Sequence, residues 1–287
     1  MDINNLKTFV SVAETGSFSV ASENLFLTQP AISKRIAALE SDLATALFDR
    51  IGRQVTLTEA GRALLPRARK ILDEIEDGRR AIRNLSGNVS GTLSLGTSHH
   101  IGLHRLPPVL SDFNQKYPDV ALDLRFLASE EVYQQVIHGD IELGIVTLPQ
   151  VPEAPLRYKK VWADPMDIMI SASSPLAKQT DLSLESLLSQ TAILPEPGTY
   201  TRDIIEEAFE KINKPLSPAM STNSLETVRM LVSIGLGWSV LPRTMISRSL
   251  KVLRYPGLQF KRELGIIWHA GRTLSNAANT FMTCIKS

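Results

Sequence analysis

The sequence predicts a two-part protein, in which a small all-α unit with a β-wing is joined by a long helix to a larger α/β unit. Apolar residues recur at helical spacing through most of the first 85 residues, and glycine turns separate the helical segments. From residue 91 onward, strand-like and helix-like runs alternate, which is typical of a sheet covered by helices. The predicted fold class is therefore α/β with an N-terminal all-α winged helix-turn-helix.

Composition narrows the possible functions. The chain has 287 residues, of which 43% are hydrophobic, so it is long enough for two or more domains with proper cores. The net charge is only +1, which excludes a grossly basic nucleic-acid protein. Charge is uneven, however: residues 28–70 hold eight basic and four acidic residues, whereas the chain from residue 91 holds 19 of each. This asymmetry predicts an anion-binding module attached to a module with another task.

Cysteine content and the N-terminal residues bear on the compartment. Cys284 is the only cysteine, which excludes an intrachain disulfide and a two-cysteine redox switch, so we expect a small core residue there. The N-terminus carries an acidic residue and no long apolar run, unlike a signal peptide, and no stretch is apolar enough to span a membrane. We expect a soluble protein that works in the cytoplasm.

The first 27 residues predict two helices. The first has an apolar face and ends at Gly16, and Ser17 is placed to cap the second, which ends in a turn at Phe26-Leu27. The apolar face of the first helix comprises Ile3, Leu6, Phe9, Val10 and Ala13, and that of the second comprises Phe18, Ala21 and Leu25.

A third helix follows at once, with Thr28 as a capping candidate and Pro30 in its first turn. Its apolar stripe comprises Ile32, Ile36, Leu39 and Leu43. The opposite face carries short or cationic side chains, namely Pro30, Ser33, Lys34 and Ala37, which suit the approach to a phosphate-lined groove. The pattern predicts a helix-turn-helix, although an ordinary helical hairpin with a solvated outer face would have the same periodicity.

A short two-stranded wing is predicted next. Gly52 lies between Arg50 and Arg53, and Val55 and Leu57 alternate with polar neighbours. Arginines on a wing can reach phosphates or a narrow minor groove, or they can be solvated turn charges.

At this point the sequence resembles a known family. Gln29-Pro30 followed by Ser33, then Leu47-Phe48-Asp49-Arg50, Arg53 and Leu57-Thr58-Glu59-Ala60-Gly61 resemble the N-terminal winged helix of the LysR-type transcriptional regulators over about 60 residues. The resemblance implies sequence-specific binding to double-stranded DNA, with base contacts from the third helix and backbone contacts from the wing. Lys34 stands where arginine is common, so bidentate recognition of guanine is not expected there. The DNA-binding residues it implies are Ser22, Thr28, Gln29, Pro30, Ser33, Lys34, Arg35, Arg50 and Arg53.

A long helix is predicted from its cap at Thr58 to about Leu85, with Pro66 expected to kink it. Its apolar positions alternate in steps of four and three, which is a heptad seam, at Leu64, Ala68, Ile71, Ile75, Gly78, Ile82 and Leu85. A seam needs a partner, either a second chain or the helix's own domain. The resemblance favours a homodimer, or a homotetramer assembled from it, on a pseudo-palindromic operator.

A polar, glycine-containing hinge at residues 85–91 suggests the domain boundaries. We expect a DNA-binding domain at residues 1–58, a linker helix and hinge at 59–90, and an effector-binding domain at 91–287. The resemblance implies that the last domain has two subdomains like a periplasmic binding protein, at about residues 91–162 with 268–287 and about 163–267, with crossings near Trp162 and Ile267.

The α/β part predicts strands that end in polar residues. The strands are expected at residues 92–97, 120–127, 141–148, 165–171 and 264–269, with a strand within 224–242. Ligands of open α/β sheets bind beyond the carboxyl ends of strands, and helix N-termini favour anions. By resemblance, Ser98, Thr147 and Thr201 would hold a carboxylate or another anion and Arg202 a second negative group, although plain helix capping by these hydroxyls is an equal alternative. The expected effector-binding residues are Thr97, Ser98, His99, His100, Ser129, Thr147, Thr199, Thr201, Arg202 and Asn223.

Other functions have less support in the sequence. His99 and His100 are expected to be a surface pair, since a metal site would need further ligands that the sequence does not identify. No serine elbow, phosphate loop or paired nucleophile and base is recognisable, so we expect no enzyme and no cofactor. A solute-binding or enzymatic protein would leave residues 1–60 without a role, and an architectural DNA protein would not respond to a ligand.

Overall fold

A computed structural model of the chain describes residues 1–51, 54–85, 87–150, 154–179 and 183–285. It consists of two compact units, Met1–Ser86 and Gly87–Ser287, each with its own hydrophobic core. Within the described residues, no helix is both long enough and apolar enough to cross a membrane.

The N-terminal unit begins with three short helices around a shared core. They are α1 (Ile3–Thr15), α2 (Phe18–Asn24) and α3 (Gln29–Leu43). The predicted stop and cap are confirmed: Gly16 has a left-handed backbone (φ +60°), and the Ser17 hydroxyl accepts from the Val20 N–H at 3.3 Å. Thr28 precedes α3 but makes no capping hydrogen bond with its side chain, so that prediction is wrong. Ile3 and Leu43, at the ends of their helices, are exposed instead of joining the apolar faces.

The wing consists of two antiparallel strands, β1 (Phe48–Ile51) and β2 (Gln54–Leu57). The predicted turn at Gly52 and Arg53 lies outside the described residues. Phe48 carries the wing into the core, because its ring contacts those of Phe9 and Phe18 at centroid distances of 5.4 and 5.9 Å. Glu40 of α3 accepts hydrogen bonds from the backbone N–H groups of Leu47 and Phe48 at 2.8 and 3.3 Å. The wing is therefore attached directly to α3.

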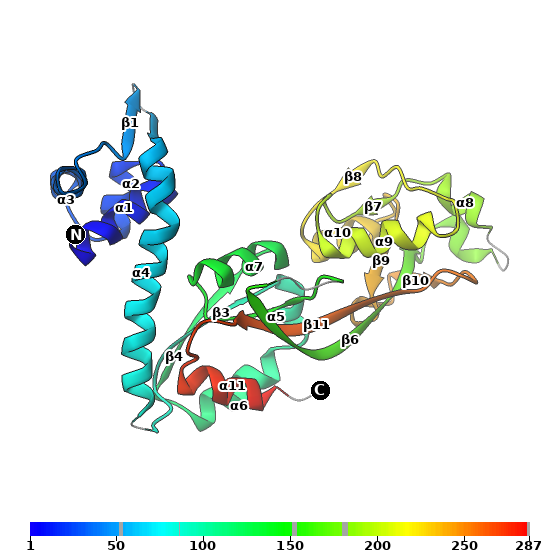
Figure 1. Cartoon of the computed structure of the whole chain (residues 1–287). Helices are drawn as coiled ribbons and strands as arrows, with labels where there is room; N and C mark the ends of the chain where they lie inside the picture. The colour runs from blue at the N-terminus through cyan, green and yellow to red at the C-terminus, as the bar shows by residue number, and fades with distance from the viewer. Residues whose placement is uncertain (52–53, 86, 151–153, 180–182, 286–287) are drawn as a thin grey trace. The chain divides into compact units, whose positions relative to one another are not determined.

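One long helix, α4 (Glu59–Asn84), completes this unit and passes Pro66 as a continuous helix (Figure 1). The Thr58 hydroxyl accepts from the Gly61 N–H at 3.0 Å and donates to the Ala46 carbonyl at 2.8 Å, which confirms the predicted cap. A Cβ atom at Gly61 would lie 2.2 Å from the Leu47 carbonyl oxygen. The close approach of helix and wing thus requires glycine at this position.

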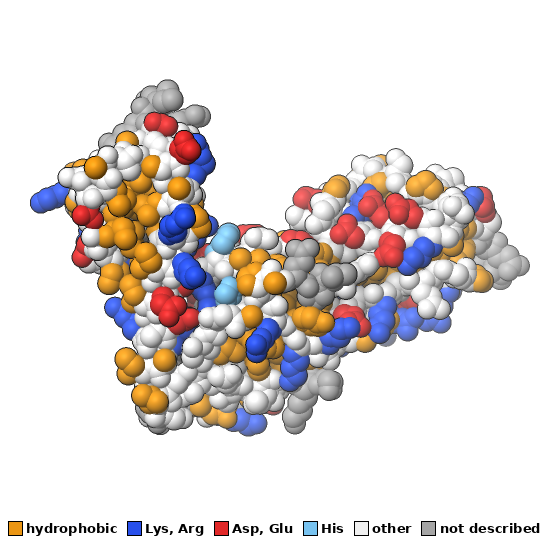
Figure 2. Space-filling model, viewed as in Figure 1, with side chains coloured by type: hydrophobic (Ala, Val, Ile, Leu, Met, Phe, Trp, Pro, Cys, Tyr) orange, Lys and Arg blue, Asp and Glu red, His pale blue; other side chains and the backbone are white. Residues whose placement is uncertain are grey.

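The two ends of the predicted apolar seam of α4 differ in burial. Ala68 is buried and Leu64 half-buried against the core of the same unit. Ile71, Ile82 and Leu85, further along, are exposed, and Figure 2 shows hydrophobic side chains on the surface at that end of α4. The first part of the seam therefore serves its own unit, whereas the later part is uncovered within the chain.

The C-terminal unit is built on one seven-stranded sheet in the order β10-β6-β11-β5-β3-β4, with β9 also paired to β6. Its strands are β3 (Gly91–Thr97), β4 (Val120–Phe126), β5 (Leu143–Thr147), β6 (Leu156–Ser171), β9 (Trp238–Pro242), β10 (Leu250–Leu253) and β11 (Phe260–His269). Within this sheet β3 pairs in parallel with β4 and β5, whereas the other strand pairs are antiparallel.

Two long strands, β6 and β11, run through both halves of this unit (Figure 1). They pair from Phe260 opposite Met166 to His269 opposite Leu156. Trp162 and Ile267, where crossings were expected, lie in these two strands.

Helices cover the sheet in both halves. The first half has α5 (His99–His104), α6 (Pro107–Lys116), α7 (Ser129–His138) and α11 (Asn276–Cys284). The second has η1 (Pro175–Lys178), α8 (Leu184–Leu188), α9 (Tyr200–Glu210), α10 (Leu225–Ser233) and η2 (Arg243–Met245), with the short parallel strands β7 (Ile193–Leu194) and β8 (Met220–Ser221). The segment between β3 and β4 forms two helices, α5 and α6, because Pro107 and Pro108 begin a new one.

Each half has its own core. Leu95, Ile145 and Phe281 lie at the centre of the first, and Ile168, Phe209 and Trp238 at the centre of the second. Between the two cores, side chains from the two halves contact one another, for example in the hydrogen bond between His104 and Glu226.

Candidate DNA-binding surface and effector cavity

The outer face of α3 carries most of the predicted DNA-binding residues. Thr28, Gln29, Pro30 and Lys34 are exposed and Ser33 is half-buried, and Figure 2 shows a basic side chain projecting outward from the region of α3. The opposite face of the helix is held in the core by buried aliphatic side chains, namely Ile32, Ile36 and Leu39. The exposed surface is small and cationic, as a helix entering a DNA groove requires.

The remaining predicted DNA-binding residues lie differently. Ser22 is buried, and its hydroxyl donates to the Ser19 carbonyl at 2.7 Å. Arg35 is half-buried and donates to the Thr8 hydroxyl at 3.5 Å. The backbone of Arg50 lies in β1, whereas the position of its side chain and all of Arg53 lie outside the described residues. Ser22 thus supports the helix-turn-helix from inside and is not available to a base, which corrects the expectation for that residue.

A cavity of about 490 Å³ lies between the two halves of the C-terminal unit. It is bordered by α5 and α7 from the first half and by the N-terminal ends of α9 and α10 from the second. Eight of the ten predicted effector-binding residues line it, namely Ser98, His99, His100, Ser129, Thr147, Thr199, Thr201 and Asn223. The carboxyl ends of β3 and β5 and the helix starts therefore meet here, as expected for an open α/β sheet.

Several of these hydroxyls also support the backbone around them. Ser98 accepts from the Ile101 N–H at 3.4 Å, and Thr199 accepts from the Arg202 N–H at 3.3 Å. Ser129 accepts from the Thr147 N–H at 3.1 Å, which ties α7 to β5. The alternative of helix capping thus holds for Ser98 and Thr199. The Thr199 hydroxyl also donates to the Glu196 carbonyl at 2.8 Å, so its own proton is already used.

Two predicted effector-binding residues do not reach the cavity. Thr97 is buried and donates to the Ile145 carbonyl at 2.9 Å. The Arg202 guanidinium lies 2.6 Å from a Glu206 carboxylate oxygen and donates to the Pro195 carbonyl at 3.0 Å. Arg202 lies in the first turn of α9 and pairs with Glu206 one turn further along that helix, so the expectation that it faces an effector is corrected.

Arg262 of β11 lies where Arg202 was expected. It is 3% exposed and donates from Nε to Asp164 at 2.8 Å and from Nη1 to the Thr201 hydroxyl at 3.0 Å. Its Nη2 is buried without a hydrogen-bond partner and the residue lines the cavity. Burial lowers the pKa of Arg262, although the adjacent Asp164 carboxylate acts against this shift. Arg262 thus has one unused hydrogen-bond donor beside the cavity.

Arg262 could have been found from the sequence. Phe260, Arg262 and Leu264 alternate along one face of a strand, and that face is buried. A cation at a core-facing strand position is expensive unless it is paired. Its partner Asp164 is 98 residues away, however, so the pair itself could not be recognised.

The cavity has an acidic rim. Glu131 and Glu196 are exposed at its edge. Glu130 reaches across from α7, where its carboxylate accepts from the Tyr200 N–H at the start of α9 at 2.7 Å. That helix start therefore already binds one carboxylate, supplied by the protein itself.

The adjacent histidines have different environments. His99 is exposed and stacks on Phe126 at a centroid distance of 5.6 Å, whereas His100 is buried. The Nε2 atom of His100 lies 3.4 Å from the Thr244 hydroxyl and 3.8 Å from an Asp164 oxygen. Burial, reinforced by the positive charge of Arg262, lowers the pKa of His100 to about 3. The expectation of a surface pair is thus wrong for His100.

Comparisons with known proteins match both units of the chain. Residues 3–62 match the family described as "Bacterial regulatory helix-turn-helix protein, lysR family", and residues 86–287 match the "LysR substrate binding domain". Over 289 residues, spanning 100% of the chain and 99% of the relative, the chain is 30% identical to a Bacillus subtilis protein named "Uncharacterized HTH-type transcriptional regulator YybE".

Two further similarities concern part of the chain and the fold. Over 108 residues, 38% of this chain and 75% of the relative, it is 69% identical to an uncharacterized HTH-type transcriptional regulator of Azotobacter vinelandii. The solved structure of a full-length OxyR variant from Pseudomonas aeruginosa superposes with a TM-score of 0.72 at 24% identity, covering 100% of this chain and 98% of that one. At that identity the superposition shows a shared fold.

Proposed function

Because this chain belongs to the LysR family of DNA-binding transcriptional regulators, we propose that paired chains bind a pseudo-palindromic operator and respond to a small anionic effector. In this proposal residues 1–58 bind DNA, residues 59–90 link and pair the chains, and residues 91–287 bind the effector. The effector domain is divided at about residues 91–162 with 268–287 and 163–267. The protein acts in the cytoplasm and as a regulator, with no catalytic step of its own.

The outer face of α3 supports the DNA-binding part of the proposal. Gln29 and Ser33 would contact base edges and Lys34 a base edge or a phosphate, while Thr28 and Pro30 would allow a close approach. The hydrogen bonds from the wing backbone to Glu40 keep the wing in place beside this helix. Arg35, Arg50 and Arg53 would then bind the phosphate backbone.

The exposed part of the α4 seam supports pairing. Ile71 and Ile82 expose apolar surface on α4, and Leu85 does so directly after it; burial of such surface favours association. An isologous contact between two such seams would create a two-fold axis, which the operator would share. Homodimers would form first, and tetramers would form from them.

The single observation that carries the effector proposal is Arg262, which lines the cavity together with hydroxyl residues and whose buried Nη2 has no hydrogen-bond partner. Asp164 compensates the positive charge of Arg262. The cavity would therefore bind an anion through individual hydrogen bonds more than through a net positive charge. Thr201 and Ser98 would add hydroxyl donors, and the α9 N-terminus would accept a carboxylate in exchange for Glu130. Both halves contribute to the cavity, so binding would change how they are held together.

The test has a DNA arm and an effector arm. A DNA duplex is first selected from a random-sequence library with the full-length protein. Gel shifts then measure the affinity for this duplex at several salt concentrations. Lys34→Ala should weaken binding about tenfold or more, since a base contact contributes ~1–3 kcal/mol. Lys116→Ala, which removes the same charge from an exposed site on α6, should leave binding unchanged. Equal affinities for Lys34→Ala and wild type would contradict the assignment.

The effector arm uses a panel of acetate, succinate, benzoate, sulfate and phosphate in thermal-shift measurements. At least one anion should raise the melting temperature and change operator affinity. Thr201→Val and Ser98→Ala should reduce both responses while leaving binding of the ligand-free protein to DNA intact. Thr283→Val, at an exposed hydroxyl on α11, is the control. A stabilising anion that still acts fully on both cavity variants would place the effector site elsewhere.

A further inference from the structure

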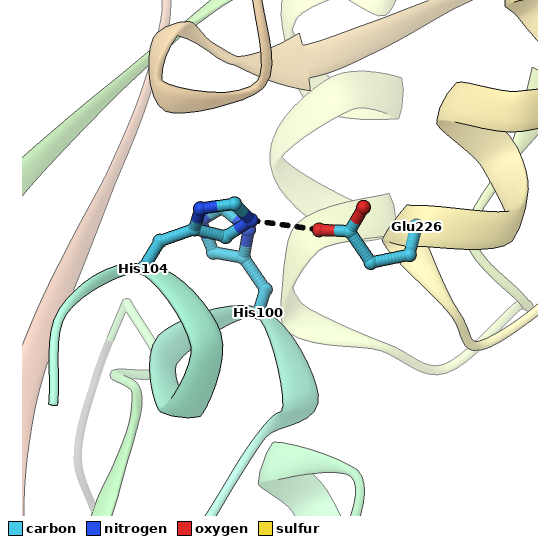
Figure 3. A group of neighbouring side chains, drawn as sticks. All are labelled: His100, His104 and Glu226. Carbon is cyan, nitrogen blue, oxygen red and sulfur yellow. Dashed lines mark hydrogen bonds and ion pairs between the residues drawn. The ribbon is translucent and has the colours of Figure 1, made fainter. Parts of the chain in front are cut away.

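We propose that His100, His104 and Glu226 bind one divalent transition-metal ion, such as Zn²⁺, at the edge of the effector cavity. The three side chains come from α5 in the first half of the unit and from α10 in the second, and they converge in Figure 3. Neither the composition nor the family match assigns a metal to this chain.

The spacing of the ligands is the first argument. His100 and His104 are four residues apart on α5, so both rings lie on one side of that helix, with a centroid distance of 4.8 Å. Two histidines at this spacing with an acidic group nearby form a common zinc-binding arrangement. Glu226, in the first turn of α10, brings its carboxylate to 2.7 Å from His104 Nε2. One potential ligand atom from each residue lies within 4.8 Å of the others.

The site can contract to metal-binding geometry. Bonds to Zn²⁺ are about 2.0–2.2 Å long, which places two tetrahedral ligand atoms about 3.4 Å apart. The side chains of His104 and Glu226 are 31% and 27% exposed, so they can rotate while the buried His100 stays in place. The metal would replace the His104–Glu226 hydrogen bond, and the proton of that bond would leave to solvent.

An unused donor on His100 is the second, independent argument. Its Nδ1 atom is buried and has no hydrogen-bond partner, which is a cost that a ligand would remove. Its other nitrogen, Nε2, faces Thr244 and Asp164. A metal-binding histidine is typically held in this way, with its second nitrogen directed at a hydroxyl or a carboxylate.

The cationic side chains near the site are paired with a carboxylate. Arg262 and Arg105 lie nearby and oppose a cation, but both are paired with the buried Asp164 at 2.8 and 3.2 Å. Glu226 keeps its second oxygen on Arg229 at 3.1 Å, which orients the carboxylate.

A metal here would connect the two halves of the unit. Three protein ligands leave a fourth coordination position open, as in zinc sites that bind a water or an exogenous ligand. His100 and Glu226 line the effector cavity, so a carboxylate effector could fill that position. This last step rests on the proposed function, whereas metal binding itself does not.

Zn²⁺ binding to the full-length protein, after removal of metals with a chelator, tests the inference by isothermal titration calorimetry without DNA or effector. Wild type should bind one Zn²⁺ per chain, and Co²⁺ should give the intense visible absorption of a four-coordinate site. His104→Ala and Glu226→Gln, both at partly exposed positions, should each weaken binding by at least about tenfold. His99→Ala, on the same helix, and His138→Ala, on α7, are matched controls that should retain wild-type affinity.

Two results would overturn the inference. One is wild-type protein that binds no Zn²⁺ or Co²⁺ in these titrations, and the other is binding that His104→Ala and Glu226→Gln leave unchanged. Circular dichroism of each variant distinguishes loss of the site from loss of the fold. Because the measurement uses neither operator nor anion, failure of the metal site and failure of the proposed regulator function are distinguished.

Discussion

Replacement of Gly61 by alanine should destabilise the DNA-binding unit selectively. The added Cβ atom would lie 2.2 Å from the Leu47 carbonyl oxygen and 2.8 Å from a Leu57 methyl carbon, well inside an ordinary contact of 3.4 Å or more. The methyl group could rotate away, but the carbonyl belongs to the backbone that leads into the wing. Relief therefore requires α4 and the wing to separate by about 1 Å.

The size of the effect follows from two opposing contributions. Overpacking against a well-packed core costs about 1–3 kcal/mol, and a clash with backbone belongs at the upper end. Alanine in a helix gains at most about 1 kcal/mol over glycine. The expected net loss in the free energy of unfolding is therefore about 2 kcal/mol.

A control is available in the same helix. A Cβ atom at Gly78 would have no atom within 4 Å. Gly78→Ala should therefore show only the gain in helix propensity, about 1 kcal/mol. The two substitutions are chemically identical and should differ by about 3 kcal/mol in their effect on this unit.

The assay can separate the two units because all three tryptophans lie after residue 160. In urea, tryptophan fluorescence reports the C-terminal unit, whereas far-ultraviolet circular dichroism also follows the helices of the N-terminal one. Gly61→Ala should lower the urea concentration at which the dichroism of the N-terminal unit is lost, without changing the midpoint of the fluorescence transition. It should also weaken operator binding. A dichroism curve that is unchanged by Gly61→Ala would refute the argument from the close approach of α4 to the wing.

Two further predictions concern pH and assembly. The pKa of His100 is lowered to about 3 in the folded protein. Between pH 6.5 and about 3, the unfolded chain therefore binds a proton at this residue that the folded chain does not bind. The free energy of unfolding should fall as the pH falls through that window. The loss should approach about 1.4 kcal/mol per pH unit in unfolding followed by fluorescence. His100→Gln should reduce this dependence of the unfolding free energy on pH. An equal pH dependence in both proteins would contradict the environment assigned to His100. Ile82→Glu places a charge on the exposed seam of α4. In sedimentation experiments it should shift the protein from dimers toward monomers without changing the helix content. Dimers that persist at the same protein concentration would exclude the seam as the interface.

Much of the N-terminal unit was predictable because its signals are local. The helix stop at Gly16, the cap at Ser17, the wing strands and the cap at Thr58 each depend on residues within a few positions of one another. Thr28 shows the limit of such signals, because a capping residue type at the right position makes no side-chain bond. Propensity states what a residue can do locally, and packing decides whether it does so.

The sequence by itself determined the family, the helix-turn-helix, the apolar seam of the long helix and eight of the residues around the cavity, because periodicity and helix and strand ends place them. Only the tertiary structure decided which cation lies at the cavity, since Arg262 and Asp164 are 98 residues apart and Arg202 forms a local pair with Glu206 instead. Likewise His104 and Glu226 are separated by 122 residues and come into contact only in the folded C-terminal unit. Sequence spacing records which side chains share a face, whereas contact between distant segments depends on how whole elements pack.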